Sequence, residues 1–315
     1  MNNDTIHLGH PLMLSYKNRS KLTALKADSL SHAGRLVYIN SVLASFPIYY
    51  MTNILFPKEF LEKITTIIRN FWWKGNQNKG MTKPICFRAW EDIYQPKKLG
   101  GLGIKNISIV NKSMVTHTTW MVAAQKDSFL SKVLKAKYHP HTSFWKASPI
   151  GSRSVFWSSI QSIKHYINAN CIYQIHEGFV NIWSEPWCPI WDKIHSHLII
   201  PTSITPLPNQ SWNIDLINQV FDNHAARVIA NTPIVNQHTK DVLIWTPSKK
   251  GECSTKETYR FFSSTAPSMT NMQGSRNMTA QTMALLDRTW KDKNIQPKLK
   301  TFLWRLLRDQ RTQWR

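Results

Sequence analysis

Apolar residues recur every three or four positions along most of the first 170 residues, a spacing that predicts amphipathic helices. The first such run begins at Lys17 and ends at Pro47. The second follows Pro57, which suits a first helical turn. Its apolar face is formed by Phe60, Ile64, Ile67, Ile68 and Phe71. These two runs are predicted to pack against each other.

Three further helical runs follow. One starts after Asn106 and continues to Met121, and a shorter one has Phe129, Val133 and Leu134 as its apolar positions. Ser152 or Ser154 can cap the next helix, because a serine hydroxyl accepts a backbone N–H of the first turn. The apolar positions of that helix are Phe156, Ile160, Ile163 and Ile167.

The period then changes to two, which is typical of strands. Ile172–Ile175 and Phe179–Trp183 are predicted to form one hairpin, and Val242–Trp245 and Glu252–Thr255 a second. A proline-rich segment at 200–209 indicates a loop or domain boundary, and a short helix is expected near Ile214. The segment 263–284, rich in Ser, Thr, Met, Asn and Gln, is predicted to be a flexible linker. The segment 297–314 is predicted to be a helix.

These patterns predict a mainly α fold with small β-hairpins (α+β). The expected organisation is a helical region at 1–80, a helical connection with a hairpin at 81–200, a hairpin and helix at 201–262, a linker at 263–284 and a C-terminal helix at 285–315. The resemblance described below implies that the first region is thumb-like and that the last is an incomplete helical domain.

Charge narrows the range of functions. The 315-residue chain has 40 Lys and Arg against 18 Asp and Glu, a net charge of +22. The excess lies at the two ends and leaves 151–250 almost neutral. A polyanion is therefore the expected partner, with nucleic acid as the first candidate and an anionic membrane surface as the second. At 42% hydrophobic residues, the chain should still bury a core, which argues against wholesale disorder.

The cysteine spacing and the length of the apolar windows argue against disulfide-rich, zinc-knuckle and membrane-spanning proteins. The four cysteines are widely spaced with no C-x-x-C, so neither a disulfide framework nor a zinc knuckle is indicated. The most apolar window, 41–56, is shorter than the roughly twenty residues of a spanning helix. The N-terminus has no signal-peptide pattern. We expect an intracellular chain with no membrane partner, no evident small-molecule substrate and no cofactor.

Candidate catalytic motifs are weak. The glycines 100, 101 and 103 lack the Lys-Ser/Thr of a phosphate-binding loop, so a turn is favoured over a nucleotide cradle. His139 with His141, and His195 with His197, lack the spacing of a four-ligand metal site. No Asp-Asp pair marks a two-metal centre. The tryptophans could stack on bases, but most lie in apolar runs and favour core packing.

Basic side chains are the better candidates, since phosphate contacts need only a positive, donor-rich face. The expected nucleic-acid-binding residues are Lys21, Lys26, Arg35, Lys63, Arg69, Lys74, Lys97 and Lys98. Ordinary solvated lysines remain the alternative for each of them.

Several motifs resemble one known family, the C-terminal part of plant LINE-type (non-LTR) retrotransposon reverse transcriptases. The resemblance is colinear over most of the chain. The segments that carry it are Leu8–Pro11, Leu30–Met51, Phe71–Gly75, Pro96–Asn106, Ser152–Ile160, Gly178–Pro189, Asp241–Tyr259 and Pro297–Leu307.

The resemblance implies that 17–75 is a thumb region that grips a primer-template, followed by a connection and a truncated zinc-binding region. In such elements the polymerase palm lies upstream of the matching segment, and the zinc ligands lie beyond the segment matched by Phe302–Leu307. No catalytic or metal residue therefore carries over, and zinc is expected in the family rather than in this chain.

The sequence thus predicts a retroelement-derived, non-catalytic chain that binds RNA or an RNA/DNA hybrid without sequence preference, in the nucleus. Two alternatives stay open. The chain could be one part of an active RNA-directed DNA polymerase whose palm is encoded upstream, or a degenerate fragment with no function.

Overall fold

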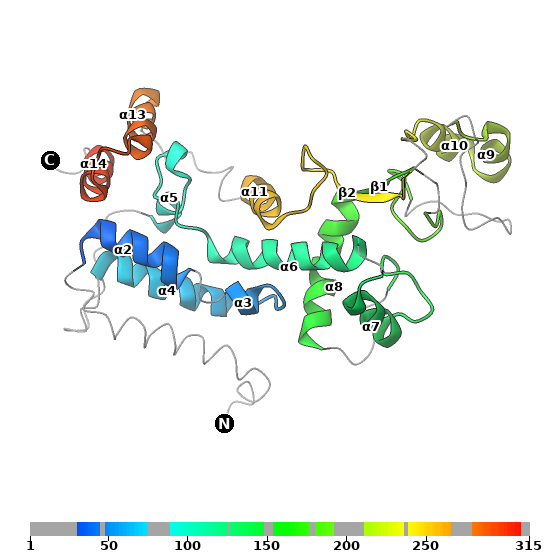
Figure 1. Cartoon of the computed structure of the whole chain (residues 1–315), viewed down its shortest axis with the longest axis horizontal. Helices are drawn as coiled ribbons and strands as arrows, with labels where there is room; N and C mark the ends of the chain where they lie inside the picture. Colours follow the sequence, from blue (N-terminus) through cyan, green and yellow to red (C-terminus); the bar gives the residue numbers. More distant parts are fainter. Residues whose placement is uncertain are drawn as a thin grey trace. The chain divides into compact units, whose positions relative to one another are not determined.

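Helices dominate the described structure. The computed structural model describes residues 30–44, 48–74, 89–124, 127–147, 154–176, 180–191, 211–235, 239–265 and 279–309. Within these ranges the strands form one two-stranded antiparallel sheet (Figure 1). This agrees with the mainly α class, with a small β element, that the periodicity predicts.

The chain divides into two compact units. Unit 1 comprises Met1–Lys112 and Phe262–Arg315, and unit 2 comprises Ser113–Phe261. The boundaries fall inside two helices, α6 (Ile107–Ala124) and α11 (Thr255–Thr265). The five-part division expected from composition stays a prediction.

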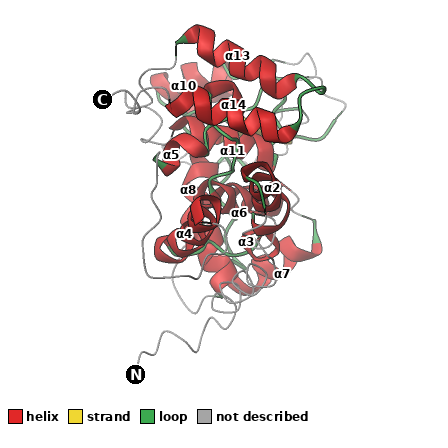
Figure 2. Ribbon diagram, turned by 90° about the vertical axis from the view of Figure 1, so that its left-hand side faces the viewer, coloured by secondary structure: helices red, strands yellow, loops and turns green. Residues whose placement is uncertain are grey.

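Unit 1 is a set of helices and short helical turns. Besides parts of α6 and α11, it contains α2 (His32–Tyr38), the π-helical turn η3 (Ile39–Leu43), α3 (Ile48–Met51), α4 (Lys58–Lys74), α5 (Trp90–Ile93), the 3-10 turn η4 (Lys97–Leu99), α13 (Ala280–Lys291) and α14 (Pro297–Asp309). Figure 2 shows α13 and α14 side by side within this unit.

The predicted packing of the first two helical runs is confirmed for α2 and α4. Arg35 of α2 donates from Nη1 to the carbonyl oxygen of Trp72 at 3.2 Å. The His32 ring meets the Trp72 ring edge to face at 5.3 Å. The apolar face of α4 is buried as expected at Ile64, Ile68 and Phe71. Apolar burial and one cross-helix hydrogen bond therefore fix this pair.

A glycine turn follows η4. Gly100 has φ of 78° and Gly103 has φ of 70°, a region that glycine occupies without strain. Gly101 has no room for a side chain, because a Cβ atom there would lie 2.0 Å from the Gln95 carbonyl oxygen. The N–H groups of all three glycines donate to backbone carbonyls of Gln95, Pro96 and Lys97. The turn interpretation is confirmed, since those amides are committed to the turn rather than directed at a phosphate.

Unit 2 surrounds an aromatic-rich core. Besides parts of α6 and α11, it contains α7 (Phe129–Tyr138), α8 (Val155–Asn170), β1 (Cys171–Gln174), α9 (Ile214–Val220), α10 (Asn223–Ala230) and β2 (Val242–Trp245). The Ser154 hydroxyl accepts the N–H of Trp157, so the predicted cap of α8 is confirmed. The core includes Trp145, Trp157, Tyr173, Trp187, Trp212 and Trp245.

The two predicted hairpins are wrong, although their first strands exist. β1 pairs with β2 in antiparallel register, with Cys171 opposite Trp245. Each strand buries alternate residues in the same core, which makes this long-range pairing favourable. The expected second strands adopt other structure: 182–184 is a turn, and Ser254 accepts the N–H of Glu257 at the start of α11.

Both ends of the segment 263–284, which is predicted as a linker, are helical. α11 continues to Thr265, and α13 begins at Ala280 after the Thr279 hydroxyl has accepted the N–H of Thr282. A polar composition suggested a linker here, but capping and one buried face, which includes Leu286, suffice for a helix. Residues 266–278 lie outside the described ranges.

Candidate nucleic-acid interface

A groove of about 540 Å³ lies between α2 and the C-terminal helices of unit 1. We call it the basic groove. Its walls are Ala33, Leu36 and Val37 of α2, Asn40 and Ser41 of η3, Lys97 of η4, Trp290 of α13, and Pro297, Lys300 and Thr301 of α14. Two of these side chains are cationic, and among these described lining residues none is acidic.

Both lysines of the groove meet at Trp290. The Lys97 ammonium lies 4.5 Å from the centroid of the indole ring, within the range of a cation–π contact. Lys300 donates from Nζ to the Trp290 carbonyl oxygen at 3.2 Å. Burial, and then the charge of Lys300, lower the pKa of Lys97. Two like charges are thus held near one residue, where an anion would relieve their repulsion.

A second pair of cations, Arg35 of α2 and Arg305 of α14, flanks His32. Arg305 of α14 lies 3.5 Å from the Nδ1 atom of His32, measured from its Nη1. Since a guanidinium can only donate, Nδ1 must accept in this contact. Burial and the charges of Arg305 and Arg35 lower the pKa of His32 to about 4. The imidazole is therefore neutral at physiological pH.

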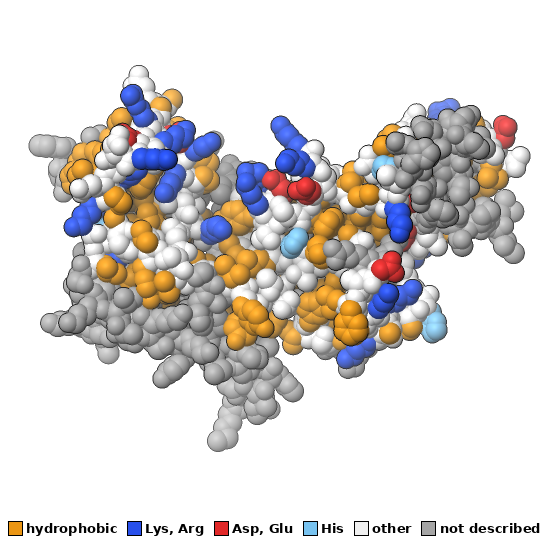
Figure 3. All heavy atoms as spheres, viewed as in Figure 1, with side chains coloured by type: hydrophobic (Ala, Val, Ile, Leu, Met, Phe, Trp, Pro, Cys, Tyr) orange, Lys and Arg blue, Asp and Glu red, His pale blue; other side chains and the backbone are white. Residues whose placement is uncertain are grey.

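Basic residues also gather on the outer surface of this part of unit 1. Figure 3 shows Lys and Arg side chains over α13 and α14. The exposed ones include Arg288, Lys291, Lys293 and Lys298. Lys291 is paired with Asp287 one turn earlier on α13, so it is partly neutralised. The rest extend the positive field of the basic groove and suit a polyanion rather than a single small anion.

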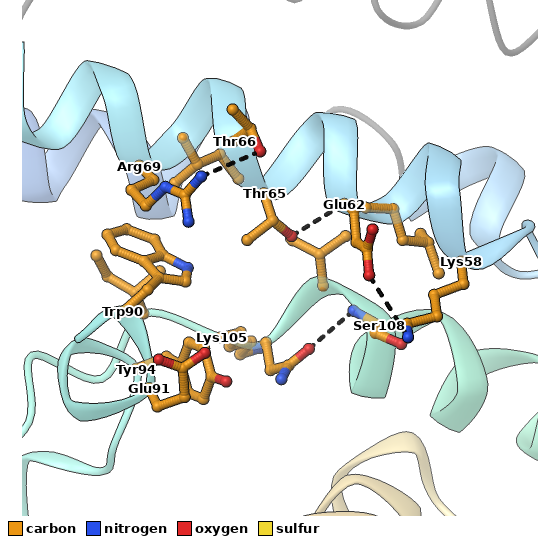
Figure 4. A pocket seen from close by; sticks show the side chains of 15 residues that line it. Lys58, Glu62, Thr65, Thr66, Arg69, Trp90, Glu91, Tyr94, Lys105 and Ser108 are labelled. Carbon is orange, nitrogen blue, oxygen red and sulfur yellow. Dashed lines mark hydrogen bonds and ion pairs between the residues drawn. The ribbon is translucent and has the colours of Figure 1, made fainter. Parts of the chain in front are cut away.

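A second cleft of unit 1, of about 480 Å³, has mixed charge. It lies between α4, α5 and the start of α6 (Figure 4). Arg69 and Trp90 point toward each other across it, but Glu62 and Glu91 line it too. Lys58 pairs with Glu62 at 3.7 Å. Asn106 already caps α6 by accepting the N–H of Ser108, so this cleft is the poorer phosphate site.

The structure separates the eight basic residues predicted from the sequence. Lys97 lines the basic groove, and Arg35 lies on α2 with its guanidinium bonded to Trp72. Arg69 lines the mixed cleft, whereas Lys63 and Lys98 are exposed elsewhere on unit 1. Lys21, Lys26 and the side chain of Lys74 lie outside the described residues. The prediction that these residues bind nucleic acid stays a prediction.

Lys300, which lines the basic groove, and Arg305, which lies beside His32, are not among the eight residues predicted from the sequence. Lys300 and Arg305 stand on a helix whose basic residues are visible in the sequence, but nothing local connects them with α2. Trp304 of the same helix donates from Nε1 to the Gly100 carbonyl oxygen at 2.8 Å. That bond brings α14 to the glycine turn that follows Lys97.

The remaining candidate chemistry finds no support among the described residues. No group of three or more His, Cys, Asp or Glu side chains there could hold a metal ion. His139 is buried and stacks on Trp157 at 5.7 Å, while His195 and His197 lie outside the described ranges.

Within the described helices, none is long and apolar enough to cross a membrane. Trp72, Trp157, Trp187 and Trp245 are fully buried, so core packing is confirmed for these four.

Comparison with known proteins gives two plant relatives. No family model matches the chain. It is 25% identical over 302 residues to an Arabidopsis thaliana protein named "Putative ribonuclease H protein", a match that covers 90% of this chain and 46% of that protein. It is 27% identical over 146 residues to an uncharacterized mitochondrial protein of the same plant, covering 45% of this chain and 92% of that protein. The chain therefore spans about half the length of the first relative.

Proposed function

We propose that this chain is a retroelement-derived nucleic-acid-binding protein that holds RNA or an RNA/DNA hybrid in the basic groove, without a catalytic centre of its own. The net charge of +22 and the similarity to a plant protein named for action on RNA support this proposal. The resemblance of the sequence to the region that follows a reverse-transcriptase palm supports the finer assignment. On this proposal the chain works in the nucleus.

The observation that carries the proposal is the convergence of Lys97 and Lys300 on Trp290. The lysines are far apart in sequence and repel each other, yet the fold holds them in one groove with no acidic side chain among its described lining residues. Binding at such a site gains free energy because the lysines displace the counterions condensed on the nucleic-acid phosphates. Because phosphates are common to every sequence, binding should be non-specific.

The test is fluorescence anisotropy with a labelled RNA/DNA hybrid at several salt concentrations. Each lost phosphate contact lowers the slope of log affinity against log salt by about one. The double variant Lys97→Gln/Lys300→Gln should therefore bind more weakly and lose about two units of slope. Single-stranded RNA and dextran sulfate serve as comparison ligands. A hybrid that binds no more tightly than dextran sulfate would speak against a nucleic-acid function.

The matched control removes the same charge elsewhere. Lys249 and Lys250 are exposed in the turn after β2 and take no part in the groove. Lys249→Gln/Lys250→Gln should keep the slope of the unmodified chain. If both double variants lose the same slope, net charge alone governs binding and the groove assignment is wrong.

A second candidate is that the chain is one part of an active enzyme on nucleic acid, since the first relative is named as a ribonuclease. In that case, the transcript that encodes this chain should carry a palm with an Asp-Asp motif upstream of it. A transcript without that motif favours the non-catalytic proposal.

A further inference from the structure

α7 buries a different face from the one its sequence suggests. Phe129, Val133 and Leu134 are the apolar positions of the predicted helix, but Phe129 is 85% exposed and Val133 is 44% exposed. The buried positions are Ser131 and Leu134. Leu130 is 42% exposed as well, so three large apolar side chains of this short helix are exposed to solvent.

Specific contacts fix this rotation of α7. The Ser131 hydroxyl donates to the Val122 carbonyl oxygen of α6 at 3.0 Å. The Tyr138 ring stacks on Trp157 at 4.7 Å with an interplanar angle of 3°. Turning Phe129 inward would break these contacts, so its exposure is a property of the packed helix.

Lysines border the exposed apolar residues. At 100° per residue, Phe129, Val133 and Ala136 form a stripe along the outer side of α7, with Lys132 on one flank and Lys137 on the other. Both lysines are exposed. Lys132 has one acidic neighbour, the fully exposed Asp127 at 3.9 Å, a pair too solvated to cancel its charge. Figure 3 shows hydrophobic and basic side chains together over α7.

A pocket of about 520 Å³ opens beside this stripe. Lys132 and Lys135 line it, together with the acidic residues Asp127 and Glu185. Glu185 accepts the N–H of Asn181 at 3.0 Å. The lining residues that can offer hydrogen bonds include His141, Thr142, Ser143, Asn181 and Ser184. Phe144 and Trp145 lie deeper. The pocket is within the size range of small-ligand sites and is mixed in character.

We propose that this face of unit 2, which we call the α7 face, binds single-stranded nucleic acid. One unpaired base stacks on Phe129, the flanking phosphates contact Lys132 and Lys135, and the next nucleotide lies at the mouth of the polar pocket. Exposed aromatics with adjacent cations bind single strands in this way, because every base has a stackable face. A duplex offers no free base for the phenylalanine.

The observations favour this partner over a lipid surface or an apolar helix. The exposed large apolar side chains of α7 are Phe129, Leu130 and Val133. Lys132 and Lys137 are exposed beside them, so charge complementarity favours an anionic partner. Besides the carboxylates of Asp127 and Glu185, the adjoining pocket presents hydroxyl and amide groups, which match base edges. The α7 face lies within unit 2 and the basic groove within unit 1, so the two proposals are independent.

The test uses the full chain and a labelled oligothymidylate. Phe129→Ala should weaken binding by about fivefold or more at unchanged salt slope, because stacking is lost while the charge stays. Lys132→Gln/Lys135→Gln should weaken binding and lower the salt slope. Both changes lie at exposed positions, and melting temperatures check that the fold is kept. The controls are Ile214→Ala, at an exposed position of α9, and Lys249→Gln/Lys250→Gln; both should bind normally.

A second readout locates the contact. An oligonucleotide that carries 5-iodouracil should cross-link to the tryptic peptide 127–132. A molar excess of duplex DNA should not prevent this cross-link. Unchanged oligonucleotide affinity in Phe129→Ala, or cross-links confined to unit 1, would overturn the proposal. So would loss of binding to phosphatidylserine vesicles in that variant while oligonucleotide binding is kept. If Lys97→Gln/Lys300→Gln has no effect while the α7 variants weaken binding, the groove proposal fails and the α7 proposal stands.

Discussion

The side chain of Asn111 accepts the backbone N–H of Phe56 at 2.9 Å, across 55 positions of sequence. Its amide nitrogen donates to the carbonyl oxygens of Met51 at 3.0 Å and Ile54 at 2.7 Å. Asn111 itself is fully buried. One carboxamide of α6 thus satisfies three backbone groups between α3 and α4, where no regular secondary structure could do so.

Asn111→Ala should lower the free energy of unfolding by about 3 kcal/mol, because it leaves three backbone groups without their partner. Urea unfolding followed by circular dichroism measures this loss. Asn70→Ala, at an exposed position of α4, is the control and should change stability by less than about 0.5 kcal/mol. Similar values for the two variants would contradict the role given to Asn111.

Gly101→Ala should destabilise unit 1 strongly. The new Cβ atom would lie 2.0 Å from the backbone oxygen of Gln95, which no side-chain rotation can relieve. We expect a loss on the order of 3 kcal/mol or more, measured by thermal unfolding. The matched control is Gly34→Ala in α2, where the nearest atom, Leu30 Cδ2, lies at 3.4 Å. A helical glycine with that space should gain about 0.5 kcal/mol on substitution, so the two variants should move in opposite directions.

His32 should make the stability depend on pH in the weakly acidic range. Its pKa is lowered from 6.5 to about 4 in the folded chain, so between these values the unfolded chain binds more protons. The contribution of His32 is therefore present above pH 6.5 and is lost as the pH falls toward 4. His32→Asn keeps an acceptor but cannot titrate. Its stability should fall less than that of the unmodified chain between pH of about 7 and about 5. Equal pH dependence of the two chains would rule this out.

Lys164 should make the stability of the fold depend on pH in the alkaline range. It is buried, donates from Nζ to the Ala147 carbonyl oxygen at 2.8 Å, and burial lowers its pKa from 10.5 to about 8. Between these values the unfolded chain binds the extra proton, so the Lys164 contribution to stability rises with pH. Burial raises the pKa of Cys253 to about 12, which has the opposite effect.

The comparison with Lys164→Met isolates the lysine. The difference in unfolding free energy between the two chains should shift in favour of the unmodified chain by on the order of 2 kcal/mol from pH 8 to pH 10.5. Denaturant melts at both pH values measure it. A constant difference would mean that the ammonium is solvated in the folded chain.

Local signals predicted much of the helical structure. Pro57 and the apolar periodicity after it mark α4, and Ser154 marks the start of α8, because caps and periodicity act within one or two turns. The faces of the helices were less predictable. Phe129 is as apolar as any core residue, but contacts of Ser131 and Tyr138 decide the rotation of α7. Asn111 looked like an ordinary polar residue of a helix because its partners lie on another segment.

By itself the sequence determined the helical class, the position of most helices, the glycine turn after Lys97 and the positive charge that calls for a polyanion. Each of these depends on composition or on residues within a few positions of one another. Only the tertiary structure decided that β1 pairs with β2, and that Lys97 and Lys300 converge on Trp290. Pairings of this kind depend on which distant segments can bury their surfaces together, and that competition is settled by packing over the whole unit rather than by local pattern.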